Sequence, residues 1–120
     1  MRRRGSILVV ETDEGIRHLL ERWLVDAGYD VCSPRPTSGA PLPRLDLVIL
    51  DVPRPEDAGS TIQALDLKGD LPVLLLSARL RRGVRSSAGV ASRLGVRMVL
   101  AKPFAQSELL MAVELALRSG

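Results

Sequence analysis

The chain has 120 residues, of which 46% are hydrophobic and 26% charged, and its formal net charge is +3. This length supports one domain with a sizeable core, and the composition argues against disorder. One cysteine, Cys32, excludes an internal disulfide framework, and with one histidine it cannot form a zinc site, so we interpret it as a small apolar filler.

No apolar stretch approaches the roughly 20 residues needed to cross a bilayer, and residues 1–4 are not followed by a signal-peptide core. We therefore expect a cytoplasmic protein with no membrane partner. The basic residues are mostly arginine, but acidic residues are interspersed with them, and aromatic residues make up only 2% of the chain. Few side chains are thus available to stack on unpaired bases. We interpret the basic cluster 79–85 as a solvated loop and residues 1–4 as a frayed terminus, and expect no nucleic-acid binding by this domain.

The first part of the chain predicts a strand, a helix and a second strand. Ser6–Val10 is apolar enough for a buried strand, Asp13 stands at a helix-capping position, and Gly28 ends the helix. Residues 29–32 predict a short strand. The helix is expected to bury one face, made by residues at helical spacing: Ile16, Leu19, Leu20, Trp23, Leu24 and Ala27.

The middle of the chain predicts a loop, a strand and a short helix. Residues 33–43 carry four prolines, which cannot continue a helix, so a loop is expected there. Residues 46–50 form an apolar run that predicts the third strand. A possible capping box at residues 60–63 predicts a helix that continues to about Lys68 and is stopped by Gly69.

The last part predicts two more strands, each followed by a helix. Residues 72–76 form the fourth strand, which ends at Ser77, and residues 96–101 form the fifth. Between them, residues 84–94 make a poor helix because glycine and serine dilute its propensity. The helix Gln106–Arg118 is expected to bury one face: Leu109, Leu110, Val113 and Leu117.

Strands that alternate with helices imply right-handed crossovers and a parallel sheet covered on both sides. Five strands suit the flavodoxin-like, doubly wound order 2-1-3-4-5. Because polar groups that follow parallel strands emerge at one edge, we expect Glu11, Asp51 and Ser77 to converge there, with Lys102 arriving from the fifth strand. We expect one domain over residues 1–120, with its core at about 6–118.

Five segments in this order resemble the receiver domain of two-component response regulators, over about Ser6 to Arg118. Each segment is weak alone, but their order and spacing together are specific. The segments are Ile7-Leu-Val-Val10 with an acidic residue next, Ala27-Gly-Tyr-Asp-Val31, Asp46-Leu-Val-Ile-Leu-Asp51 with Pro55 and Gly59, Leu71-Pro-Val-Leu-Leu-Leu-Ser-Ala78, and Lys102-Pro-Phe104.

The resemblance implies a phosphorelay, in which a sensor histidine kinase or phosphotransfer protein passes a phosphoryl group to Asp51. The acyl phosphate would then bias two conformations of the domain. Such chemistry needs a carboxylate nucleophile, a magnesium ion and a cation opposite the ion. The resemblance assigns Lys102 as that cation and Ser77 as the hydroxyl that reads the phosphate. It assigns the magnesium (Mg2+) ligands to Glu11, Asp51 and the backbone carbonyl of Pro53.

The chain departs from the family pattern at this metal site. Glu11 is one methylene longer than the usual aspartate, and Thr12 supplies no charge where a second acidic residue is usual. Thr12 or Asp13 is a further candidate ligand, although the place of Asp13 at a helix start favours backbone capping. Because magnesium demands near-ideal octahedral geometry, we expect its binding to be weakened.

Other departures lie away from the metal. Val99 stands where the family has an aromatic residue that helps to read the phosphate. The proline-rich segment 33–43 is shorter than usual, which predicts that the family's second helix is reduced. The family's usual dimer face would be formed by 84–94, 96–101 and Gln106–Arg118, so a homodimer through this face is a candidate.

Two functions therefore remain open from the sequence. The first is a phosphorylatable receiver, a signalling domain with at most self-catalysed phosphoryl transfer and dephosphorylation. The second is a pseudo-receiver, a protein-interaction module that works without phosphorylation, in which the Asp51 and Lys102 pair is structural and magnesium is absent. His18, beside Arg17, is expected to be exposed to solvent rather than catalytic.

Overall fold

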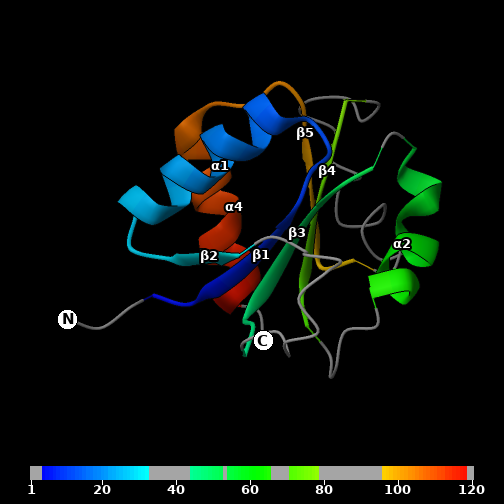
Figure 1. The fold of residues 1–120 in the computed structure, drawn as a ribbon, viewed down its shortest axis with the longest axis horizontal. Helices are drawn as coiled ribbons and strands as arrows, with labels where there is room; N and C mark the ends of the chain where they lie inside the picture. Colours follow the sequence, from blue (N-terminus) through cyan, green and yellow to red (C-terminus); the bar gives the residue numbers. More distant parts are fainter. Residues whose placement is uncertain (1–3, 33–43, 53, 66–70, 79–95, 119–120) are drawn as a thin grey trace.

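The computed structural model describes residues 4–32, 44–52, 54–65, 71–78 and 96–118. These residues form a parallel sheet in the order β2-β1-β3-β4-β5, so the predicted flavodoxin-like order is confirmed (Figure 1). The strands are β1 (Ser6–Val10), β2 (Asp30–Cys32), β3 (Leu47–Asp51), β4 (Val73–Ser77) and β5 (Met98–Ala101). The helices are α1 (Glu14–Asp26), α2 (Ala58–Leu65) and α4 (Gln106–Arg118).

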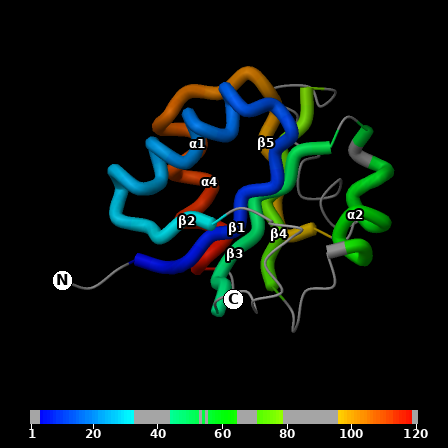
Figure 2. The backbone as a smooth tube through the Cα atoms, in the orientation of Figure 1, coloured from blue at the N-terminus to red at the C-terminus, as the bar shows by residue number. Residues whose placement is uncertain are grey.

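The sheet is covered on both faces, as its apolar strands require. Helices α1 and α4 lie on one face and α2 on the other (Figure 1). Successive side chains of a strand point to opposite faces, so Ile49 joins the core beneath α1 and α4, while Val48 and Leu50 join the core beneath α2. Figure 2 shows β1, β3 and β4 passing through the middle of the fold.

Helix α1 begins and ends where the sequence predicts. The Asp13 carboxylate accepts a hydrogen bond from the backbone N–H of Ile16 at 3.0 Å, so the predicted N-cap is confirmed. Gly28 follows the helix with a φ of +99°, a conformation that favours glycine. Leu20 and Leu24 are fully buried as expected, but the prediction for Leu19 is wrong, since this residue is 45% exposed.

Most strand boundaries shift by one or two residues. β3 includes Asp51 and begins after Asp46, whose carboxylate instead accepts a hydrogen bond from the Ser6 N–H at 2.9 Å. β4 likewise includes Ser77. β5 begins at Met98 rather than at residue 96, and β2 begins at residue 30 rather than 29. The last helix has the predicted bounds, and its predicted face packs against the core.

The predicted capping box at residues 60–63 is wrong. Helix α2 begins at Ala58, after a short 3-10 turn at Pro55–Asp57. Ser60 and Thr61 therefore lie inside the helix, and each hydroxyl donates a hydrogen bond to the carbonyl of Asp57 at 3.0 Å. A Ser or Thr hydroxyl can either cap a helix or bond to a backbone carbonyl one turn earlier. The spacing of the residues in the sequence does not distinguish these two arrangements.

The prediction of a frayed terminus is wrong for Arg4. Its backbone N–H donates to the carbonyl of Gly28 at 3.1 Å, and its guanidinium forms an ion pair with Glu114 of α4 at 3.2 Å. The same guanidinium lies 4.9 Å from the ring centroid of Tyr29. Arg4 thus joins β1 to the end of α1 and to α4.

Several predictions fall outside the described residues: the loop at 33–43, the end of the second helix near Lys68 and Gly69, the basic cluster 79–85 and the helix at 84–94. Residues 1–3 also lie outside them. Within the described part of the chain, no helix is long and apolar enough to cross a membrane.

The buried strands predict a clear stability difference between core and surface. Leu75 of β4 is fully buried, whereas Met111 of α4 is 63% exposed. Leu75→Ala should lower the free energy of unfolding by about 2–5 kcal/mol because it leaves a cavity. Met111→Ala should change it by less than about 0.5 kcal/mol. Urea denaturation measures both, and equal losses would contradict the assigned core.

Candidate functional site

The candidate site lies at the carboxyl edge of the sheet, because four neighbouring parallel strands end there. Val10 of β1 pairs with Leu50 of β3, so Glu11 and Asp51 follow side by side. Ser77, the last residue of β4, pairs with Ala101 of β5, and Lys102 comes directly after it. The register therefore places all four predicted side chains on adjacent strand ends.

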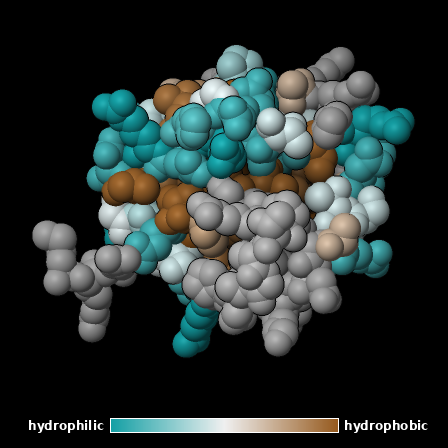
Figure 3. Space-filling view, viewed as in Figure 1, coloured by the Kyte–Doolittle hydropathy of each residue, from teal (hydrophilic) through white to brown (hydrophobic). Residues whose placement is uncertain are grey.

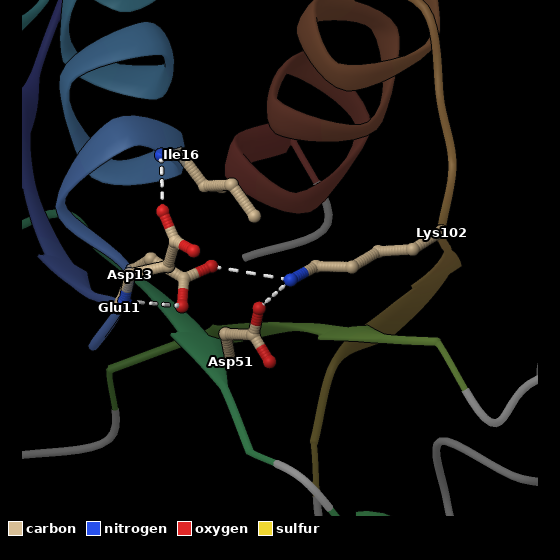
Figure 4. Close-up of polar contacts among 5 residues, drawn as sticks. All are labelled: Glu11, Asp13, Ile16, Asp51 and Lys102. Atoms are coloured by element: carbon tan, nitrogen blue, oxygen red, sulfur yellow. Dashed lines mark hydrogen bonds and ion pairs between the residues drawn. The ribbon is translucent and has the colours of Figure 1, made fainter.

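Lys102 joins the two carboxylates of the site (Figure 4). Its ammonium Nζ donates to Oδ2 of Asp51 and to Oε1 of Glu11, the latter at 3.2 Å. The side chains of Lys102, Glu11 and Asp51 are 19%, 4% and 12% exposed. Charges so poorly exposed to water interact strongly and require partners. The predicted meeting of an amine and two carboxylates is thus present.

The backbone holds Lys102 in place from the neighbouring strand. The Lys102 N–H donates to the carbonyl of Ser77 at 3.0 Å, and the Lys102–Pro103 peptide bond is cis. Ser77 itself is fully buried at the end of β4. Ser77 and Lys102 therefore lie on adjacent strand ends, joined by a backbone hydrogen bond.

Both oxygens of Glu11 are occupied. Oε1 accepts from Lys102, and Oε2 accepts from the backbone N–H of Asp13 at 3.2 Å. The Asp13 carboxylate points the other way, toward the start of α1, where it caps Ile16 (Figure 4). Asp13 and the neighbouring Thr12 are exposed. The sequence did not indicate that a backbone donor would fix the second oxygen of Glu11.

Two of the predicted magnesium ligands, Glu11 and Asp51, lie among the described residues. The described residues contain no group of three or more His, Cys, Asp or Glu side chains able to hold a metal ion. Glu11 and Asp51 are the two carboxylates at the rim, and each gives an oxygen to Lys102. The carbonyl of Pro53, the third predicted ligand, lies outside the described residues. Magnesium usually binds through one or two carboxylates and keeps several of its waters, so Glu11 and Asp51 are the described residues that could hold it.

Other residues considered from the sequence do not contact the two carboxylates or Lys102. His18 is exposed on α1, as expected. Cys32 packs against the core beneath α2, and burial raises the pKa of its thiol, which suits an unreactive filler. Val99 of β5 packs against the same core. The pKa of Tyr29 is also raised, mainly by burial and further by Glu114, while Arg4 opposes the change.

An apolar groove of about 350 Å³ opens beside Lys102, and sequence reasoning missed it. Trp23 of α1 meets Phe104 edge to face, with ring centroids 6.4 Å apart. The exposed Leu19 lies along the same groove, which explains why this apolar residue is not covered. The available signal was the helical spacing of Leu19 and Trp23 together with an aromatic residue after Lys102-Pro103. The lining residues are Ile16, Leu19, Leu20, Trp23, Ala78, Lys102, Pro103 and Phe104.

The chain is similar in sequence to curated regulatory proteins. No protein-family model matches the chain. It is 37% identical over 107 residues to the uncharacterized transcriptional regulatory protein YrkP of Bacillus subtilis, covering 86% of the chain and 45% of YrkP. It is also 37% identical over 117 residues to protein PetR of Rhodobacter capsulatus, covering 93% of the chain and 48% of PetR. The chain thus spans about half the length of these relatives.

Solved structures of regulatory proteins share the fold of this chain. A response regulator receiver protein from Burkholderia phymatum superposes with a TM-score of 0.70 at 29% identity, and the match covers 96% of each chain. The chemotaxis protein CheY4 of Vibrio cholerae has a TM-score of 0.69 at 24% identity over 94% of this chain and 98% of its own, which shows the shared fold. In fold and in sequence, the chain is similar to the receiver domains of response regulators. Receiver domains of response regulators are signalling proteins.

Asp13 was considered from the sequence both as the cap of α1 and as a magnesium ligand, and the two roles predict different effects of substitution. Asp13→Ala should lower the free energy of unfolding by about 1 kcal/mol because an N–H at the start of α1 loses its cap. Asp13→Asn retains a capping oxygen and should restore most of that stability. Thermal unfolding without magnesium measures both variants. Equal destabilisation by alanine and asparagine would mean that capping is not the main role of Asp13.

Proposed function

We propose that this receiver domain accepts a phosphoryl group on Asp51 from a sensor histidine kinase or a phosphotransfer protein. The observation that carries the proposal is the arrangement of the Asp51 carboxylate at the rim (Figure 4). Lys102 holds Oδ2, while Oδ1 makes no polar contact with the other described residues. One oxygen is thus oriented by a cation, and the other is a candidate nucleophile.

The proposed transfer follows from the chemistry of a carboxylate nucleophile. Oδ1 of Asp51 attacks the phosphorus of a phosphohistidine, a P–O bond forms and the P–N bond breaks. The imidazole leaves with the bonding electrons and takes a proton from water. Lys102 offsets the negative charge that the phosphoryl group brings to the rim. Ser77, at the end of the neighbouring strand, is proposed to read the phosphoryl oxygens with its hydroxyl.

Magnesium is proposed to bind weakly to this chain, through Glu11, Asp51 and the carbonyl of Pro53. Thr12 offers no charge, and Asp13 is committed to α1. The domain is proposed to be a signalling module whose only catalysis is its own phosphorylation and dephosphorylation. Residues 6–118 are proposed to act as one unit, which is supported by the continuous sheet that unites the described strands.

A homodimer through the face of α4 and β5 is also proposed. Met111 and Leu115 lie one turn apart on α4 and are 63% and 44% exposed. Exposed apolar side chains grouped on one helix face favour a protein partner. Hydrophilic residues dominate the surface over α1 in the view of Figure 3, although Leu19 and Val25 of α1 are 45% and 56% exposed. The remaining part of the proposed face, 84–94, lies outside the described residues.

Phosphorylation of Asp51 is tested with acetyl phosphate and millimolar magnesium. The wild-type chain should gain one phosphoryl group by mass, and Asp51→Asn should gain none because the amide is a poor nucleophile. Asp26→Asn, at the exposed end of α1, is the matched control and should be modified like the wild type. If the folded wild type stays unmodified while it still binds a partner, the domain is a pseudo-receiver.

Self-association is tested by sedimentation, with and without acetyl phosphate. Leu115→Glu should abolish any dimer because it puts a charge into an apolar contact. Val25→Glu changes a residue of α1 that is 56% exposed, and it should leave the dimer intact. A monomeric wild type in both states, or equal effects of the two variants, would contradict the proposed face.

A further inference from the structure

We infer that Arg4 forms a clamp that limits the opening of the second half of α4, residues 112–118, away from the sheet. The Arg4 clamp is the set of contacts that Arg4 makes with the end of α1, the start of β2 and α4. It lies at the amino edge of the sheet, opposite the rim, because Arg4 precedes β1 and Tyr29 precedes β2. The inference concerns the motion of α4, and it requires neither phosphorylation of Asp51 nor a dimer.

The Arg4 guanidinium contacts three elements at once. Its Nη1 donates to the backbone carbonyl of Ala27 at 3.3 Å, and its Nη2 donates to Oε1 of Glu114 at 3.2 Å. Its central carbon lies 4.9 Å from the ring centroid of Tyr29, which is buried in the core beneath α1 and α4. A planar guanidinium suits such stacking and divergent donation better than an ammonium does. The clamp therefore depends on the shape of arginine as well as on its charge.

The backbone fixes the position of Arg4 before its side chain reaches α4. The Arg4 N–H donates to the carbonyl of Gly28 at 3.1 Å. A Cβ atom built on Gly28 would lie only 3.2 Å from Cδ of Arg4, so glycine lets the arginine side chain pass close to the backbone. Exposed ion pairs usually contribute little, partly because two long side chains must be held in one geometry. Arg4 is already held by its other contacts, so its pairing with Glu114 loses less side-chain entropy.

The second half of α4 buries little apolar surface of its own. Leu109, in the first half, is a large and fully buried side chain, whereas the buried residues that follow it are smaller: Ala112, Val113 and Ala116. A smaller side chain removes less apolar area from water and contributes less to stability. Segments with few buried apolar contacts open more readily than the rest of a fold. Glu114 lies within this half, so its bond to Arg4 ties down a segment that packing holds less firmly.

The inference is tested by amide hydrogen exchange, followed residue by residue by NMR. Arg4→Met keeps an apolar stem but removes the guanidinium. Exchange in residues 112–118 should become about three- to tenfold faster, because an ion pair and a cation–π contact are lost. Exchange in α2, on the opposite face of the sheet, should change by less than about twofold, since its local openings do not break the clamp. Arg22→Met removes the same charge from an exposed position of α1 and should leave residues 112–118 within about twofold of the wild type.

Unchanged exchange of residues 112–118 in folded Arg4→Met would overturn the inference. Equal acceleration in α2 would also overturn it, because Arg4 would then stabilise the whole fold rather than α4.

If Arg4→Met does not fold, the response to salt carries the test. Salt screens the pair of Arg4 and Glu114, whose side chains are 46% and 44% exposed. Relative to α2, about 0.5 M NaCl should accelerate exchange of residues 112–118 in the wild type about twofold, and Glu114→Gln should abolish this response. Arg118→Met is the matched control and should keep it, because Arg118 lies 3.9 Å from the same carboxylate and is 77% exposed. A response that persists in Glu114→Gln, or that is lost in Arg118→Met, would overturn the inference.

Discussion

The interaction on which the site depends is the bridge from one ammonium to two carboxylates. Lys102 binds Asp51 and Glu11, which come from different strands, and all three side chains are poorly exposed. Two carboxylates this close would repel each other without a cation between them. The bridge thus offsets the repulsion between the two carboxylates that the sheet brings to one rim.

The sheet makes this bridge possible. Parallel pairing in the order β2-β1-β3-β4-β5 brings strand ends that are far apart in sequence to one edge. Apolar side chains on both faces fix the register, because a slip of one residue would exchange the two buried faces. The polar residues that end each strand are then placed by the same packing that stabilises the core.

The bridge has different surroundings on its two sides. Thr12 and the capping role of Asp13 leave Glu11 as the one carboxylate that β1 contributes to the rim. On the other side of Lys102, Trp23 and Phe104 line an apolar groove. Lys102 therefore lies between the two carboxylates and this apolar groove.

Local pattern was enough to determine the strand and helix order, the Asp13 cap and the residue types at the rim. These features depend on periodicity and on nearest neighbours along the chain. The same reasoning failed for Leu19 and for the start of α2, where packing and hydroxyl-to-carbonyl bonds override local preference. The sequence predicted that Lys102 meets the two carboxylates, but only the tertiary structure decided that both oxygens of Glu11 are taken. Such contacts depend on distances between strands remote in sequence, which no local pattern encodes.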